Sequence, residues 1–410
     1  MLSVKKILSD IESGRRTALD CLAESASSIA EKDAEIGAFE CRAPLPTENP
    51  EGPLAGLAIG VKDIYDTYDL PTCQGSSVYA GWQPAADAAL VAMARQKGGW
   101  VAGKTVTTEF AFLEPARTKN PVNTAHTPGG SSSGSAAAVA AGMVPAAFGS
   151  QTGGSVIRPA AFCGISGFKP SFRLAPSVGM KTFAWSLDTP GFFAASAADM
   201  TELVARLLER PLTFETGPGL RIGIYRSGDW DQVSPDMQDA VQNAARMAEK
   251  AGALIGDCAE PESLAKARSL HGVVQNHEAA RALGHELRLH RSQISQTLLA
   301  ALDAGAAVSA ADYDAARSAA RIARKAATGL FADFDVLLAP SALGAAPLGL
   351  GSTGSPLVNK LWTLCGNPCV SVPGLKGANG MPLGVQIIAR FGRDSLALAA
   401  AAWLEDRLKG

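Results

Sequence analysis

Two Gly-Gly-Ser turns lie close together in the sequence, and an upstream lysine could act as a base for their serine hydroxyls. The first turn, TPGGSSSGS (127–135), contains Ser131, and the second, QTGGSVIRPA (151–160), contains Ser155. Lys62 lies in LAIGVKDIYDT (57–67), where apolar residues precede it. Burial lowers the pKa of a lysine because the charged form loses its hydration, so a buried amine can accept a proton near neutral pH. Together, these residue types could perform nucleophilic acyl transfer.

The glycines give the second turn a further capacity. Gly153 and Gly154 let the backbone approach a substrate closely and point consecutive N–H groups at one position, as an oxyanion hole requires. In the first turn, the hydroxyl of Ser131 could relay a proton between Lys62 and Ser155. Two plainer interpretations stay open. A Gly-Ser-rich segment is often only a flexible turn, and Lys62 could form a salt bridge with one of the nearby acids, Asp63 or Asp66.

Other chemistry has weaker support. The segment 98–105 matches the letters of a phosphate-binding loop, but a predicted helix precedes it and a predicted strand occupies it, the reverse of the required order. None of the five histidines stands in a G-x-S-x-G elbow, so a histidine-based triad is not expected. The seven cysteines are widely spread and are interpreted as packing residues. The sequence therefore predicts no metal site and no cofactor.

Composition and charge indicate an ordinary globular protein. The chain has 410 residues, of which 47% are hydrophobic and 19% charged, and a formal net charge of −2. Its 37 Lys and Arg residues are scattered, which gives no reason to expect a nucleic-acid partner. No window of about twenty apolar residues predicts a membrane span, and MLSVKKILSDIESGRR lacks the features of a secretory signal. A cytoplasmic protein with no membrane partner is expected.

The elements that must position these residues alternate between strands and helices. Strand character is found at 57–64, 100–105, 220–225, 335–340, 367–375 and 382–390, and helical periodicity at 1–33, 87–98, 132–142, 198–209, 235–252, 261–290, 310–331 and 395–408. This alternation predicts an α/β fold with a layered sheet. We expect a single domain, 1–410, with a catalytic core at about 52–195 and 333–410 and a helical middle section at about 196–332.

The longer motifs resemble the amidase signature family. They are GVKD (60–63), NPVNTAHTPGGSSSGSAAAVAAG (120–142), GSQTGGSVIRPAAFCGISGFKPS (149–171), GNPCVSVP (366–373) and PLGVQIIAR (382–390), in the family's order. The resemblance implies the amidase signature fold, a central mixed twisted β-sheet covered by helices on both faces. It also implies a Ser-cisSer-Lys triad with Ser155 as nucleophile, Ser131 as bridging serine in a cis peptide and Lys62 as base. The N–H groups of the turn at Thr152, Gly153 and Gly154 are the candidate oxyanion hole.

The sequence departs from the commonest family pattern beside the predicted nucleophile. Most members have Asp and Arg where this chain has Gln151 and Ile157, and an arginine appears one position later as Arg158. This variant is similar to that of malonamidases, members that act on malonamate. We therefore expect Arg158 to bind a substrate carboxylate, with capping of nearby carbonyls as the alternative role. Gln275 is expected to line the substrate pocket.

The predicted function is hydrolysis of the C–N bond of a small linear amide, malonamate-like and bearing a carboxylate, with release of ammonia through a Ser155 acyl-enzyme. The family offers two alternatives, the amidase subunit of a tRNA-dependent amidotransferase and a hydrolase of a urea-derived acid such as carboxybiuret. A fatty-acid-amide hydrolase is disfavoured because no membrane anchor is found, and a non-catalytic protein because all three triad positions are occupied. The expected partners are a small amide and a second copy of the chain in a homodimer.

Overall fold

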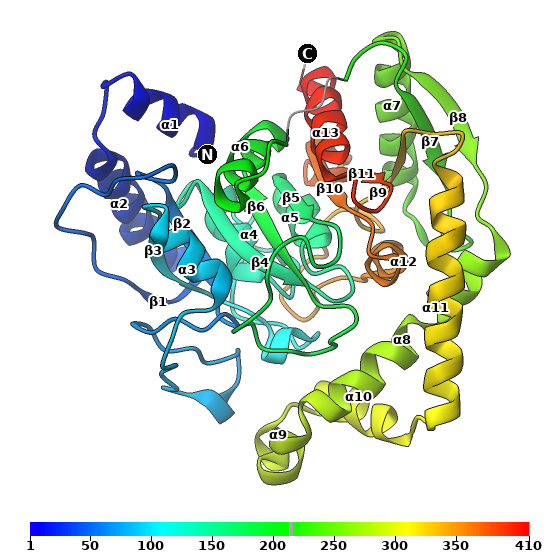
Figure 1. The fold of residues 1–410 in the computed structure, drawn as a ribbon, viewed down its shortest axis with the longest axis horizontal. Coiled ribbons are helices and arrows are strands. Elements are labelled where there is room, and N and C mark those ends of the chain that lie inside the picture. The colour runs from blue at the N-terminus through cyan, green and yellow to red at the C-terminus, as the bar shows by residue number, and fades with distance from the viewer. Residues whose placement is uncertain (213–215, 410) are drawn as a thin grey trace.

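The computed structural model describes residues 1–212 and 216–409, and a mixed sheet of eleven strands lies at its centre (Figure 1). The strands are β1 (Phe39–Arg42), β2 (Ala58–Lys62), β3 (Trp100–Thr105), β4 (Ala146–Gln151), β5 (Ser166–Lys169), β6 (Thr189–Ala194), β7 (Arg221–Tyr225), β8 (Leu254–Cys258), β9 (Val336–Pro340), β10 (Cys369–Lys376) and β11 (Pro382–Ala389). Their order is β1-β3-β2-β4-β6-β5-β10-β11-β9-β7-β8. β2 is parallel to β3 and β4, β7 is parallel to β8 and β9, and the other pairs are antiparallel.

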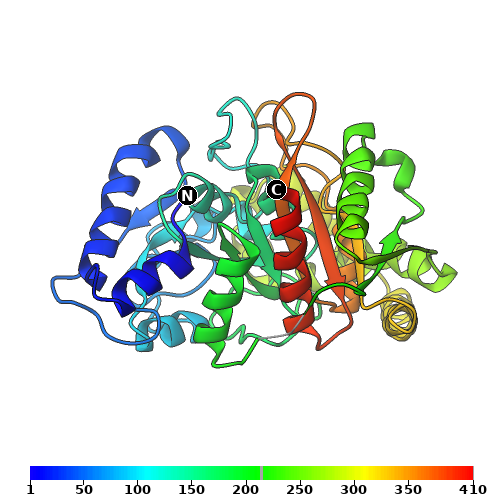
Figure 2. The same ribbon diagram turned by 90° about the horizontal axis from the view of Figure 1, so that it is seen from above.

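Helices cover both faces of this sheet. They are α1 (Val4–Glu12), α2 (Ala18–Ile36), α3 (Ala89–Gln96), α4 (Ser133–Ala140), α5 (Ile157–Cys163), α6 (Ala197–Leu208), α7 (Pro235–Lys250), α8 (Glu262–Ala282), α9 (Gly284–Leu289), α10 (Gln296–Ala307), α11 (Ala310–Leu330), α12 (Leu357–Cys365) and α13 (Asp394–Lys409). α6 and α13 pack on one face, and α4 and α5 pack on the other (Figure 2). The predicted α/β fold, with a mixed sheet between helices, is confirmed. No helix within the described ranges is long and apolar enough to cross a membrane.

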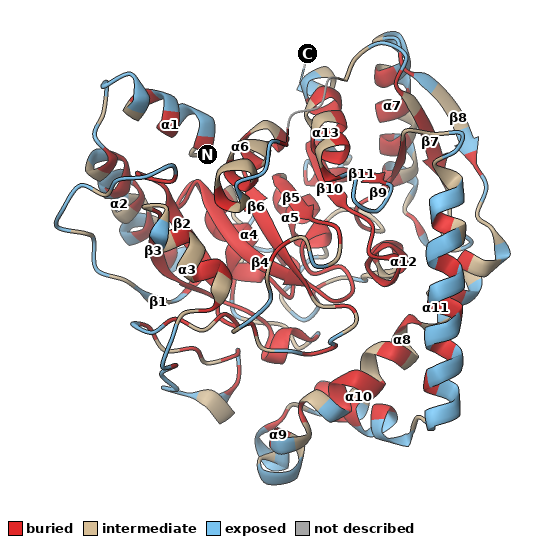
Figure 3. Ribbon diagram, viewed as in Figure 1, coloured by how far each residue is buried: buried red, intermediate tan, exposed pale blue. Residues whose placement is uncertain are grey.

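Burial explains the apolar strands of the sequence. The central strands are buried throughout, whereas α11 exposes its outer face (Figure 3). Strands covered by helices on both faces have no solvent side, so their sequences are apolar runs rather than an alternating apolar and polar pattern. Together, α8, α10 and α11 form a helical group whose first member also packs on α12.

Most predicted elements are present, but two predicted helical stretches are each divided in two. The stretch 261–290 forms α8 and α9, which are separated at Leu283. The periodicity of 1–33 predicted one helical stretch, but α1 and α2 are separate helices. The chain turns between them at Gly14, where φ is +71°, a conformation that glycine adopts without a steric penalty. α2 then starts with a capping box, in which the side chains of Thr17 and Asp20 accept from each other's backbone N–H groups.

The sheet brings the two chemically important segments to one edge. β2 and β4 are parallel neighbours, so both end at the same side of the sheet. Lys62 is the last residue of β2, and the Ser155 turn follows β4. The turn containing Ser131 leads into α4, which packs on both strands. The rejected phosphate-loop match is β3, with α3 before it, as the sequence indicated.

Candidate active site

Lys62 ends in a cluster of hydroxyl groups. Its side chain is fully buried, and its Nζ lies 2.7 Å from the Oγ of Ser131 and 2.9 Å from the Oγ of Ser150. Burial lowers the pKa of Lys62 well below its usual value, and no acidic side chain in residues 1–212 or 216–409 forms an ion pair with it. A neutral amine beside a serine hydroxyl can accept that hydroxyl's proton.

The alternative salt bridge between Lys62 and its neighbouring acids is wrong. The carboxylate of Asp63 lies 3.1 Å from the Nζ of Lys104 on β3, and both side chains are buried. Asp63 follows the last residue of β2, and its carboxylate binds the lysine of the neighbouring strand rather than Lys62. The Lys104 ammonium also donates to the hydroxyl of Thr72 at 2.6 Å. This separate ion pair leaves Lys62 without an acidic partner.

The turn containing Ser131 has the backbone that the family resemblance implied. The peptide bond between Gly130 and Ser131 is cis. The carbonyl of Gly130 accepts a hydrogen bond of 2.7 Å from Nη2 of Arg158 on α5, and the carbonyl of Ser131 accepts from the N–H of Thr108 at 3.2 Å. The turn is therefore held from two directions, with its hydroxyl against Lys62.

Gln151 organises the start of the turn that contains Ser155, the predicted nucleophile; this turn (152–156) is called the nucleophile turn below. Its Oε1 accepts the N–H groups of Val156 at 2.9 Å and Ile157 at 3.1 Å, and its Nε2 donates to the hydroxyl of Thr363 at 3.0 Å. The side chain thereby satisfies two backbone donors at the N-terminus of α5, which lack partners within the helix. A neutral amide thus performs a capping role where most family members have an acid, and Ile157 is buried as an apolar residue.

The carbonyls of Thr152 and Gly153 are held by side chains from α8 and α12. The carbonyl of Thr152 accepts from Nε2 of His271 at 2.9 Å, and that of Gly153 accepts from the hydroxyl of Thr363 at 2.9 Å. A planar trans peptide directs its N–H opposite to its carbonyl, so these bonds also orient the next two N–H groups. Within the described residues, the N–H groups of Gly153, Gly154 and Ser155 donate to no protein acceptor. They are available for an oxyanion.

His271 was not singled out in the sequence, where it is one residue of a long helix. Its side chain is fully buried, and burial lowers its pKa to about 4, so the ring is neutral at pH 7. A carbonyl oxygen can only accept, and Nε2 therefore carries the proton that His271 donates to Thr152. The contact joins residues 119 positions apart in the chain, which no local pattern reveals.

Replacing His271 by leucine is expected to lower kcat roughly tenfold or more and to change KM less. The buried carbonyl of Thr152 would lose its donor, and an unsatisfied buried group costs roughly 1–3 kcal/mol, which the turn would recover by rotating its N–H groups away from the oxyanion. His271→Gln supplies an N–H of similar reach and should restore most of kcat. Steady-state kinetics on both variants test this expectation, and it is wrong if both lose kcat equally or if only KM rises.

Asp188 is a second residue that sequence reasoning missed. Its carboxylate accepts the hydroxyl of Thr152 at 2.6 Å and the N–H groups of Phe183 and Ala184 at 2.8 and 2.9 Å. Burial raises its pKa to about 6, whereas these hydrogen bonds act in the opposite direction. The negative charge of Asp188 also favours protonated Lys62, but less strongly than burial disfavours it.

The nucleophile turn borders a small cavity of about 230 Å³. The predicted residues Thr152, Gly153, Gly154, Ser155, Arg158 and Gln275 all line it, together with Ala111, Phe112, Leu113, Phe183, Gly272, Asn276, Pro356 and Lys360. No residue of this lining is acidic. The side chain of Gln275 lies close to the turn, because its Oε1 is 3.9 Å from the position that a Cβ on Gly153 would take.

Arg158 carries an unbalanced charge at this cavity. It is 1% exposed, and burial lowers its pKa to about 9, so the guanidinium remains charged at neutral pH. Nη2 donates to the carbonyl of Gly130, so the alternative role as a carbonyl cap is partly present. Nε and Nη1, however, find no partner in the described part of the protein. Buried charges are normally paired, so an incoming anion would complete the site.

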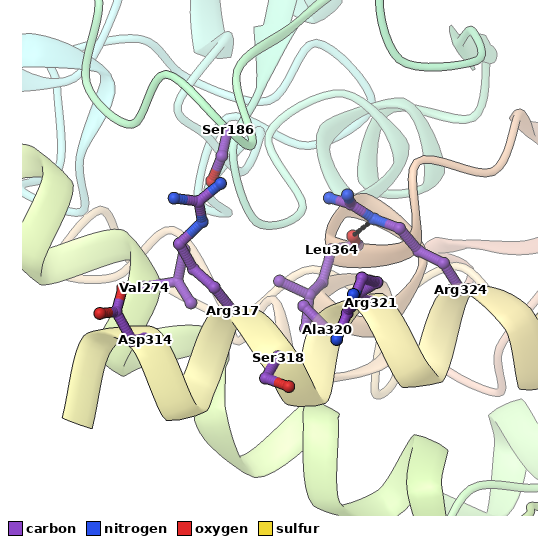
Figure 4. Close-up of a pocket in the computed structure, with 9 residues that line it drawn as sticks. All are labelled: Ser186, Val274, Asp314, Arg317, Ser318, Ala320, Arg321, Arg324 and Leu364. Carbon is purple, nitrogen blue, oxygen red and sulfur yellow. Dashed lines mark hydrogen bonds between the residues drawn. The ribbon is translucent and has the colours of Figure 1, made fainter. Parts of the chain in front are cut away.

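A second cavity, of about 330 Å³, lies along α11 and does not include Ser155 (Figure 4). Arg317 extends toward Ser186, and Nε of Arg324 donates to the carbonyl of Leu364 at 3.0 Å. The arginines that line it are exposed, which is the usual state of a solvated helix face. Ser155, the predicted nucleophile, therefore lines the smaller cavity and not this one. The described ranges contain no group of three or more His, Cys, Asp or Glu residues that could hold a metal ion.

Comparison with known proteins places these features in a family. The family model named Amidase matches residues 12–398. A glutamyl-tRNA(Gln) amidotransferase subunit of Rhodopirellula baltica is 31% identical, over 97% of this chain and 95% of that protein. AtzE of Pseudomonas sp. (strain ADP), which is a subunit of 1-carboxybiuret hydrolase, is 30% identical, over 98% and 97%.

A solved crystal structure of an amidase superposes with a TM-score of 0.90 at 26% identity, covering 99% of this chain and 100% of that one. The match of the family model extends over nearly the whole chain and includes both Gly-Gly-Ser turns. These similarities agree with the fold and with the motifs that carry the site residues. The chain belongs to the amidase signature family of serine amidases, which hydrolyse C–N bonds.

Proposed function

We propose that this amidase hydrolyses a small linear amide that carries a carboxylate, such as malonamate, and releases ammonia. The observation that carries the proposal is the buried guanidinium of Arg158, which has two unpartnered nitrogens within the described residues, in the cavity that Ser155 also lines. A cavity of about 230 Å³ suits a compact substrate, because pockets for drug-sized ligands begin at roughly 300 Å³.

The proposed reaction begins with the hydroxyl cluster. Neutral Lys62 accepts the proton of Ser131, Ser131 accepts that of Ser155, and Ser155 attacks the amide carbonyl. The N–H groups at Gly153 and Gly154, with Thr152 and Ser155 as further candidates, stabilise the oxyanion of the tetrahedral intermediate. The same relay returns the proton to the departing ammonia. Water then hydrolyses the acyl-enzyme and restores the serine.

The substrate carboxylate is proposed to bind Arg158. Loss of a charge-assisted hydrogen bond costs roughly 1.5–3 kcal/mol, so Arg158→Met should lower the ratio of kcat/KM for malonamate to kcat/KM for uncharged propionamide by roughly ten- to a hundredfold. Arg158→Lys keeps the charge and should retain part of that ratio. Ammonia release from both amides measures it. An unchanged ratio in Arg158→Met would leave Arg158 with its role at the Gly130 carbonyl alone.

A second candidate function comes from the relatives. One of them is named as part of an amidotransferase and the other as part of 1-carboxybiuret hydrolase, so both names describe components of assemblies. If this chain works in the same way, it should hydrolyse malonamate poorly when purified alone and gain activity toward glutamine or carboxybiuret with a partner protein. Robust malonamate turnover by the isolated chain would favour the first proposal. The homodimer expected from the sequence stays a prediction.

A further inference from the structure

Helix α12 holds a second cation at the substrate cavity. The start of this helix packs directly on the nucleophile turn, because a Cβ placed on Gly154 would lie 3.0 Å from Nδ2 of Asn359 and 3.1 Å from Cβ of Pro356. Lys360 is the next residue of α12, and it lines the cavity together with Ser155 and Arg158.

The backbone at Lys360 is fixed by its buried neighbour. Nδ2 of Asn359 donates to the carbonyl of Ser341 at 2.9 Å, and its Oδ1 accepts from Nε2 of Gln386 on β11 at 3.0 Å. Asn359 and Gln386 are both fully buried. These bonds tie α12 to the sheet, so the Cα of Lys360 has a defined position relative to the nucleophile turn.

The charge of Lys360 has no protein counter-ion. Neither an ion pair nor a hydrogen bond joins its Nζ to any residue in 1–212 or 216–409. The charged group that acts on it is Arg158 on α5, and the charge of Lys360 in turn lowers the pKa of His271 on α8. Burial and, secondarily, the charge of Arg158 lower the pKa of Lys360. With His271 neutral, the cavity holds two cations from two helices and no acid in its lining.

We propose that Lys360 is a specificity-determining residue that binds the substrate carboxylate together with Arg158. This inference rests on the proposed function and adds a second anchor to it. A carboxylate has two oxygens, each able to accept more than one hydrogen bond, so it can satisfy an ammonium and a guanidinium at once. The two cations repel each other in the empty cavity, and a bound carboxylate removes that repulsion. An uncharged amide neither satisfies the two cations nor removes their repulsion, so the pair of cations selects for the acidic substrate.

The first test is the selectivity ratio in Lys360→Met, which keeps the length and the apolar stem of the side chain. We expect the malonamate-to-propionamide ratio of kcat/KM to fall roughly tenfold, mainly through the KM for malonamate. Lys360→Arg should retain most of the ratio. Lys325→Met on exposed α11 serves as the matched control. A wild-type ratio in Lys360→Met would overturn the proposal.

A second readout separates this inference from the proposed substrate. Malonate is used as a competitive inhibitor, with propionamide turnover as the assay, so that binding of an anion is measured without malonamate hydrolysis. We expect the inhibition constant to rise roughly tenfold in Lys360→Met. If malonate inhibition depends on Lys360 but the wild-type enzyme does not hydrolyse malonamate, then Lys360 does bind a carboxylate and the proposed substrate is wrong. If Arg158→Met loses the preference for malonamate while Lys360→Met keeps the wild-type selectivity ratio and inhibition constant, the role of Lys360 is wrong and the proposed function stands.

Discussion

Ser155→Ala is expected to lower kcat for amide hydrolysis by a factor on the order of 10⁴ or more, because no acyl-enzyme can form. Lys62→Met should have an effect of similar size, since Ser155 would lose the base that receives its proton. Groups that act as one unit are non-additive, so the double variant should be no slower than the single ones. Ammonia release by each variant measures this. Residual turnover near the wild-type rate in Ser155→Ala would contradict the assignment.

Ser150 provides the control for the relay. Its hydroxyl is 2.9 Å from the Nζ of Lys62, nearly as close as the 2.7 Å of Ser131. Proton relay is assigned to Ser131 alone, so Ser131→Ala should reduce kcat far more than Ser150→Ala. The reverse order would make Ser150 the relay.

Lys104→Met is expected to destabilise the fold by about 3–5 kcal/mol, because it leaves the buried carboxylate of Asp63 without its cation. Burial raises the pKa of Asp63 to about 6, while Lys104 acts to lower it. Without Lys104 the pKa should rise further. A raised carboxyl pKa means that the folded state favours the protonated form. The loss of unfolding free energy in Lys104→Met should therefore be small near pH 5 and larger near pH 8.

Thermal unfolding of wild type and Lys104→Met at both pH values measures this loss. Lys6→Met is the control, since Lys6 forms an ion pair with Asp10 but its side chain is 73% exposed; exposed pairs contribute roughly 0–1 kcal/mol. Equal shifts of the unfolding temperature in the two variants would show that the buried pair lacks the proposed effect. A shift in Lys104→Met that does not change with pH would show the same.

The sequence predicted the apolar strands well and the small-residue strands poorly. The segment 57–64 contains β2, and 335–340 contains β9, because runs of branched apolar residues fit a buried strand. β4, with the sequence AAFGSQ, has little intrinsic strand preference and was not predicted. Its pairing with β2 and β6 overrides that preference. α10 was missed for a similar reason, since it is fixed by packing on α8.

Motifs identify the predicted site residues, but the residues that support them are distant in the chain. The Gly-Gly-Ser turns and Lys62 stand out in the sequence because of their glycines and apolar context. His271 binds the distant Thr152, and Lys360 lines the cavity that Ser155 also lines; nothing in their local sequence marks them. The ion pair of Lys104 with Asp63 likewise depends on the register of two strands. Such residues become visible only when the fold is known.

The central claim is that Ser155 carries the acyl group. The most direct measurement is mass spectrometry of peptides from enzyme that is quenched in acid during malonamate turnover, at times when ammonia release shows a burst. We expect a malonyl group on Ser155. A malonyl group on any other side chain, or an unmodified Ser155 peptide in a sample that shows the burst, would contradict it.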